Sequence, residues 1–166
     1  MGKTKKLAIM AILTAIALGI FTLEAQLPSL VPVPGVKLGL ANIITLVAMY
    51  ILNRRDAGVI LLMRIALGSL FAGSPSTLLF SAAGGLLAYI TMCLLFRLIP
   101  EERVWVTSAL AGVAHNAGQL AACALVVKTP GVIAYAPVLA ISGIITGIFT
   151  GIAAKYLLRA LKHIKL

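Results

Sequence analysis

Few side chains in this sequence are able to bind a ligand or do chemistry, and most of them lie within long apolar stretches. Arg64 stands in the middle of one such stretch, and His115, Asn116 and Gln119 follow one another closely in a second. His115 and Gln119 are four residues apart, so they share one face of a helix, with Asn116 one step around it. Because polar groups cost free energy against lipid, all of these side chains must face protein, water or a ligand.

Of these residues, Arg64 has the highest free-energy cost of insertion into a membrane. An arginine at the centre of a membrane-spanning helix costs about 2.5–3.5 kcal/mol on insertion scales. No carboxylate lies within the expected spans to neutralise it, which favours an anionic ligand. The alternative is that Arg64 pairs with backbone carbonyls or amide side chains of the next helix, and that the turn around His115 makes interhelical hydrogen bonds. We expect Arg64 and His115 to form one polar layer, roughly 10–12 Å from the cytoplasmic ends of their spans at 1.5 Å per residue.

A second set of candidate binding residues, Glu24, Lys37 and Asn42, lies nearer the outer surface. The segment 24–37 contains three prolines and a glycine, which exclude a helix, yet it is too apolar for a solvated linker. We expect this segment either to fold over a cavity as a lid or to lie in the headgroup layer. Helix N-termini that start on the outer side, together with Lys37 and Lys128, make this end favourable for an anion.

The composition decides what kind of solvent surrounds the chain. Of 166 residues, 61% are hydrophobic and 11% are charged, against roughly 45–50% and about 25% in soluble domains. This excludes a disordered chain, a disulfide scaffold and an ordinary soluble enzyme, and it predicts an all-α integral membrane protein. The cysteines Cys93 and Cys123 have no metal-ligand spacing, so we expect neither a metal nor a cofactor.

Six segments are long and apolar enough to be transmembrane helices. They form one membrane domain over residues 1–166, with spans at about 7–23, 36–52, 57–72, 76–96, 107–127 and 132–154.

Lys and Arg number 14 against 4 Asp and Glu, which gives a formal charge of +10. With the N-terminus inside, the six spans place nearly all of these cations on the cytoplasmic face and only Lys37 and Lys128 outside. We therefore interpret the basic charge as a topology signal with both termini in the cytoplasm, not as a nucleic-acid surface. The C-terminal run Lys155–Lys165 is also placed to contact anionic lipid.

Small residues recur at every fourth position in two of the spans. Ala11, Ala15 and Gly19 make a flat strip on the first span, where another helix can approach closely. Packing inside the bundle explains such a strip equally well. Gly143, Gly147 and Gly151 make a similar strip on the last span, and self-assembly through it is a further possibility.

Three motifs resemble a known family. The segments 34–43 (PGVKLGLANI), 64–71 (RIALGSLF) and 115–120 (HNAGQL) resemble signatures of the heptaprenyl diphosphate synthase component I family, also called Gx transporters. That family is similar in turn to the substrate-binding S subunits of energy-coupling factor (ECF) transporters, which are six-helix vitamin-capture proteins.

This resemblance implies a plasma-membrane subunit of a prokaryotic importer that captures a small molecule from outside, under the 24–37 segment as a lid. The ligand would be an isoprenoid or quinone precursor, a flavin or another vitamin. The AxxxA pattern of Ala11 and Ala15 matches the docking strip for a transmembrane coupling subunit, which works with two ATPase subunits. This chain has no G-x-x-x-x-G-K-[ST] loop of its own.

The family name suggests a different function, which the acidic residues test. Prenyl diphosphate elongation needs clustered aspartates to hold Mg²⁺, because hard cations take several oxygen ligands. The only acidic residues are Asp56, Glu24, Glu101 and Glu102. We therefore expect no enzyme activity, and the alternative function is a non-catalytic accessory membrane component of polyprenyl (heptaprenyl) diphosphate synthesis.

Overall fold

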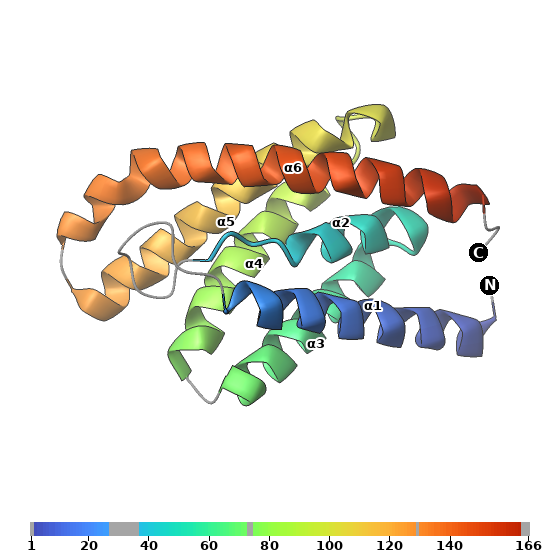
Figure 1. The fold of residues 1–166 in the computed structure, drawn as a ribbon, viewed down its shortest axis with the longest axis horizontal. Coiled ribbons are helices and arrows are strands. Elements are labelled where there is room, and N and C mark those ends of the chain that lie inside the picture. The colour runs from blue at the N-terminus through green and yellow to red at the C-terminus, as the bar shows by residue number, and fades with distance from the viewer. Residues whose placement is uncertain (1, 27–36, 73–74, 129, 164–166) are drawn as a thin grey trace.

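A computed structural model describes residues 2–26, 37–72, 75–128 and 130–163, which form six α-helices and no strand (Figure 1). The all-helical part of the predicted fold is therefore confirmed. Short 3₁₀ turns at Glu101–Arg103 and Pro130–Tyr135 precede the last two helices. The α-helices are α1 (Lys3–Glu24), α2 (Asn42–Ile51), α3 (Arg54–Ala72), α4 (Pro75–Leu95), α5 (Val104–Val127) and α6 (Ala136–His163).

Four helical stretches of the described chain are long and apolar enough to cross a membrane: Lys3–Glu24, Pro75–Leu95, Glu101–Val127 and Gly131–Lys162. The helix in the expected span 36–52 covers only Asn42–Ile51, or about 15 Å at 1.5 Å per residue, half of a bilayer core. Its start is delayed because Gly39 has a φ of +77°, a left-handed conformation that helices do not contain. The remaining long helix, α3, carries Arg64 in addition to the charged residues of its first turn.

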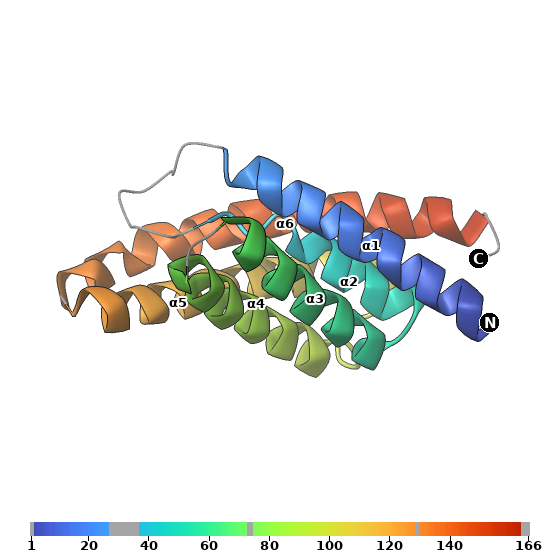
Figure 2. The same ribbon diagram turned by 90° about the horizontal axis from the view of Figure 1, so that it is seen from below.

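The first residues of α1 and the last residues of α6 lie at the same end of the bundle (Figures 1 and 2). The packing is densest between α5 and α6 and between α4 and α5, whereas α1, α2 and α3 make fewer contacts with their neighbours. The bundle therefore consists of a closely packed half, α4 to α6, and a more loosely packed half, α1 to α3. Two ion pairs tie helices at the end that holds the termini, Lys6 with Asp56 and Lys162 with Glu101, each at 2.7 Å.

Glycines bring the backbones of α5 and α6 into direct contact. A Cβ atom at Gly112 would lie 2.3 Å from the carbonyl oxygen of Gly143, and one at Gly147 would lie 2.6 Å from the Cα of Ala109. One turn further on, the hydroxyls of Ser108 and Thr150 are 3.0 Å apart. The strip of Gly143, Gly147 and Gly151 therefore packs inside this bundle, and is not an exposed surface for self-assembly.

The strip of small residues on α1 is exposed, unlike the glycines of α6. The helix buries Leu13, Ala17 and Phe21 at four-residue intervals, while Ala11, Ala15 and Gly19 are exposed. A Cβ atom at Gly19 would meet no described atom within 4 Å. The exposed strip formed by Ala11, Ala15 and Gly19, hereafter the α1 strip, thus has open space in front of it.

Candidate functional site

All the predicted binding residues except Asn116 come together in one buried cluster. Its side chains come from the end of α1, the segment before α2, the start of α2, the middle of α3 and the middle of α5. Arg64 and His115 are each 3% exposed, and Glu24 is 5% exposed. From the sequence we expect an outer set and a deeper layer, whereas in the structure these residues lie together. A small cavity between them is lined by Phe21, Glu24, Lys37, Gly39, Ala41, Arg64, Ser81, His115 and Gln119.

Glu24 holds the segment that precedes α2. Its Oε1 accepts a hydrogen bond of 2.5 Å from the Gly39 amide, and its Oε2 accepts one of 3.1 Å from the Leu40 amide. The left-handed φ of Gly39 directs both amides at one carboxylate. Hydrogen bonds to an ionised acceptor are stronger than neutral ones. Glu24 therefore fixes the point from which α2 starts. Of the 24–37 segment that we expect to act as a lid, residues 27–36 lie outside the described residues.

His115 and Gln119 reach the cluster because glycines face them. A Cβ at Gly84 on α4 would lie 2.8 Å from His115 Cε1 and from Gln119 Cγ, and a Cβ at Gly39 would lie 2.7 Å from His115 Cδ2. The imidazole is thus held between two backbones. The Gln119 side chain accepts a 3.0 Å hydrogen bond from the Lys37 amide, which ties α5 to the segment before α2.

Both cations of the cluster lie near the ring of Phe21. The Lys37 ammonium is 3.8 Å from the ring centroid and the Arg64 guanidinium is 5.6 Å from it, within the range of cation–π attraction. Arg64 also donates a long hydrogen bond of 3.5 Å from Nη2 to the Asn42 side chain. Its Nε has no hydrogen-bond partner among the described residues, and neither has either ring nitrogen of His115.

The cluster contains more positive than negative charge. Lys37 and Arg64 contribute two cations, and Glu24 is the carboxylate placed among them. Asp56 and Glu101 are engaged by Lys6 and Lys162 at the other end of the bundle. A buried charge without a counter-charge is costly, so this arrangement is suited to binding an anion.

Asn116 contacts the neighbouring helix α6. Its Nδ2 donates a 2.7 Å hydrogen bond to the Leu139 carbonyl oxygen of α6. This is the interhelical hydrogen bond of the structural alternative, and it holds α5 against α6.

Four further residues belong to the site and are not among the predicted binding residues: Phe21, Gly39, Ser81 and Gly84. Phe21 is one apolar residue among many in its helix, so no pattern distinguishes it. Ser81 and Gly84 lie three residues apart on α4 and share a face, which was a usable signal. The left-handed turn at Gly39 has no reliable signature in a single sequence.

Comparison with protein families gives one result. The family model described as heptaprenyl diphosphate synthase component I matches residues 13–157, a range that contains every residue of the cluster. Comparisons with curated proteins and with solved structures found no match.

Proposed function

Because the chain belongs to the heptaprenyl diphosphate synthase component I family, we propose that it is a non-catalytic membrane component of such a synthase. The observation that carries this proposal is the family match over residues 13–157. The word "component" in the family description implies at least one other component, which would carry out chain elongation.

The environments of the acidic residues support a non-catalytic role. Elongation requires Mg²⁺ held by several oxygen ligands beside the diphosphate. Glu24 is occupied with two backbone amides, and Asp56 and Glu101 are paired with lysines. The chain instead offers apolar helices that suit a prenyl tail and a buried cluster with excess positive charge that suits its anionic end. The ligand contacts that we propose are Glu24, Lys37, Asn42, Arg64, His115 and Gln119.

We further propose that all six helices form one domain in the plasma membrane of a prokaryote, with both termini in the cytoplasm. The common end of α1 and α6 requires an even number of crossings, and six satisfies this if α2 with its preceding segment and α3 cross as a pair. A cysteine replacing Lys128 should then react with a membrane-impermeant maleimide in intact cells, while one replacing Arg103 should react only after permeabilisation. Equal labelling of both positions in intact cells would contradict this topology.

A second candidate function rests on the α1 strip. Exposed small residues along a membrane helix are suited to a partner helix within the membrane, and a soluble synthase component cannot reach them there. This favours a solute-binding subunit of an ECF-type importer, with a coupling subunit docked at Ala11, Ala15 and Gly19 and two ATPase subunits beyond it. Its ligand would be an isoprenoid or quinone precursor, a flavin or another vitamin.

One complementation experiment separates the two functions. Washed membranes of a strain that lacks the gene should incorporate labelled isopentenyl diphosphate into long prenyl diphosphates at less than a tenth of the wild-type rate. The intact gene should restore that rate, because the synthase needs this component.

The same strain also tests the α1 strip. The double variant Ala11→Leu with Ala15→Leu should restore synthase activity, and Ile12→Leu with Ile16→Leu, which changes neighbouring exposed positions, is its control. Unchanged synthase activity in the deletion strain, with ATPases that co-purify with the control but not with the strip variant, would refute the synthase proposal and establish the importer.

A further inference from the structure

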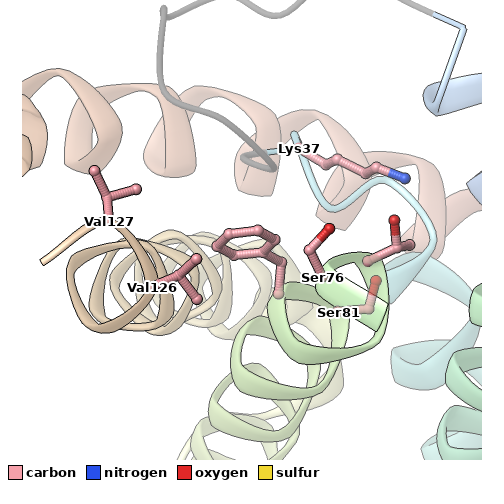
Figure 3. A pocket seen from close by; sticks show the side chains of 7 residues that line it. Lys37, Ser76, Ser81, Val126 and Val127 are labelled. Atoms are coloured by element: carbon pink, nitrogen blue, oxygen red, sulfur yellow. The ribbon is translucent and has the colours of Figure 1, made fainter. Parts of the chain in front are cut away.

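A second, larger cavity opens beside the cluster, at the start of α4 (Figure 3). Its volume is about 280 Å³, and Lys37 and Ser81 line both this cavity and the small one in the cluster. The two spaces are therefore neighbours that share a cation and a hydroxyl. The cavity is lined by Lys37, Ser76, Thr77, Phe80, Ser81, Val126 and Val127.

One wall of the cavity is polar and comes from α4. Thr77 and Ser81 are four residues apart, so they lie on the same face of the helix. Ser81 is 5% exposed and makes no hydrogen bond to any described residue, whereas Thr91 on the same helix donates to the carbonyl of the preceding turn. Figure 3 shows the Ser76 and Ser81 side chains directed toward the side of the cavity where Lys37 lies. Because Ser81 lines the cavity, its hydroxyl can donate a hydrogen bond to an acceptor that is bound there.

The charges around this wall indicate that the bound group is negatively charged. The first turn of α4 is at the cavity, and the N-terminus of a helix carries a partial positive charge. Lys37 adds a full positive charge across from it. Donor hydroxyls, a helix N-terminus and a lysine together favour an oxyanion.

The other wall is apolar and leads outward. Phe80 is buried, whereas Val126 and Val127 at the end of α5 are 49% and 43% exposed. Apolar side chains that are exposed on a membrane protein at this position are suited to lipid or to an acyl or prenyl chain. The volume suits a head group, since whole small-molecule ligands occupy pockets of roughly 300–1,000 Å³.

We propose that this cavity binds the phosphate-type oxyanion head of an amphiphile whose apolar chain leaves past Val126 and Val127. The assignment of that chain as a prenyl chain rests on the proposed synthase function, while the oxyanion site rests on Lys37, Thr77, Ser81 and the start of α4. A phospholipid head group or free diphosphate would present the same chemistry, so the test has to separate these sources.

The test is equilibrium binding of labelled farnesyl diphosphate to the purified chain in phosphatidylcholine nanodiscs, with empty nanodiscs subtracted. We expect saturable binding that excess inorganic diphosphate displaces and farnesol does not. Lys37→Gln should raise Kd at least tenfold, because the cation is lost. Ser81→Ala should raise it about threefold, because one donor is lost.

Lys5→Gln is the matched control. It makes the same change of lysine to glutamine at an exposed position near the start of α1, at the other end of the bundle from the cavity. It should leave Kd unchanged. Each variant is compared with the parent chain by thermal unfolding, and Ser81→Ala keeps the test valid if Lys37→Gln proves unstable.

Binding that is not saturable, or that both Lys37→Gln and Ser81→Ala leave unchanged, would overturn the proposal. If nanodiscs containing phosphatidylglycerol suppress binding as strongly as inorganic diphosphate does, the site stands and its occupant is a lipid head group. If binding in nanodiscs is weakened by the variants but synthase activity in membranes does not depend on the gene, the synthase function is overturned and the oxyanion site stands. If synthase activity depends on the gene but no such binding is found, the oxyanion site is overturned and the synthase function stands.

Discussion

The Gly112→Val variant should lose the folded bundle. The added Cβ would lie 2.3 Å from the backbone carbonyl oxygen of Gly143, and a backbone atom cannot move aside as a flexible side chain can. Separating α5 from α6 enough to admit the side chain would also break the hydrogen bond between Ser108 and Thr150. Overpacking typically costs about 1–3 kcal/mol and occasionally more, and we expect a cost at or above the upper end of this range because the close atom belongs to the backbone. The measurement is the free energy of unfolding in mixed micelles, titrated with a denaturing detergent.

Gly19→Val is the matched control, because it makes the same change within another long helix. A Cβ at Gly19 meets no described atom within 4 Å, so the free energy of unfolding should change by less than about 1 kcal/mol, the range of helix propensity. If the two variants are equally stable, the close contact between α5 and α6 is not what holds these helices together.

The second large effect is expected at Glu24. Glu24→Gln removes the charge that offsets Lys37 and Arg64, and it replaces a carboxylate acceptor of two backbone hydrogen bonds by an amide with one oxygen. Breaking a buried charge arrangement by removing one partner costs about 3–5 kcal/mol, so the variant should unfold that much more easily. The measurement is again the free energy of unfolding in mixed micelles.

A double-mutant cycle separates the charge effect from the hydrogen bonds. Arg64→Met combined with Glu24→Gln should cost less than the sum of the single variants, with a coupling energy of about 1–3 kcal/mol. Glu102→Gln, at an exposed position, should change stability by no more than about 0.5 kcal/mol. If the changes in the free energy of unfolding of the two cluster variants are strictly additive, Arg64 and Glu24 do not interact electrostatically.

The burial of Arg64, His115 and Gln119 was predictable from residue type, because a polar side chain in an apolar stretch has few acceptable environments. Their assembly into one cluster was not. It depends on the left-handed turn at Gly39, which delays the start of α2. Because of this turn, Glu24 and Lys37 lie around the same cavity as Arg64. The direction of Asn116 was equally unpredictable, because one step around a helix is enough to turn a side chain from the cluster to α6.

The two strips of small residues show the same limit for packing. Ala11, Ala15 and Gly19 have the spacing of Gly143, Gly147 and Gly151, and both strips allow a backbone to approach. The structure buries the second against α5 and leaves the first exposed. The spacing of small residues shows that another helix could pack closely against that face. Whether the face is buried depends on which helix the fold places opposite to it.

The close contact of α5 with α6 has a mechanical consequence. Backbones in van der Waals contact leave no side-chain layer to repack, so α4, α5 and α6 form a stiff unit, while the sparser contacts of α1, α2 and α3 make that half more compliant. Glu24, Lys37 and Arg64 stand on the compliant side, and His115 and Gln119 stand on the stiff side. Any displacement of one half against the other is therefore concentrated at the residues that surround the cavity.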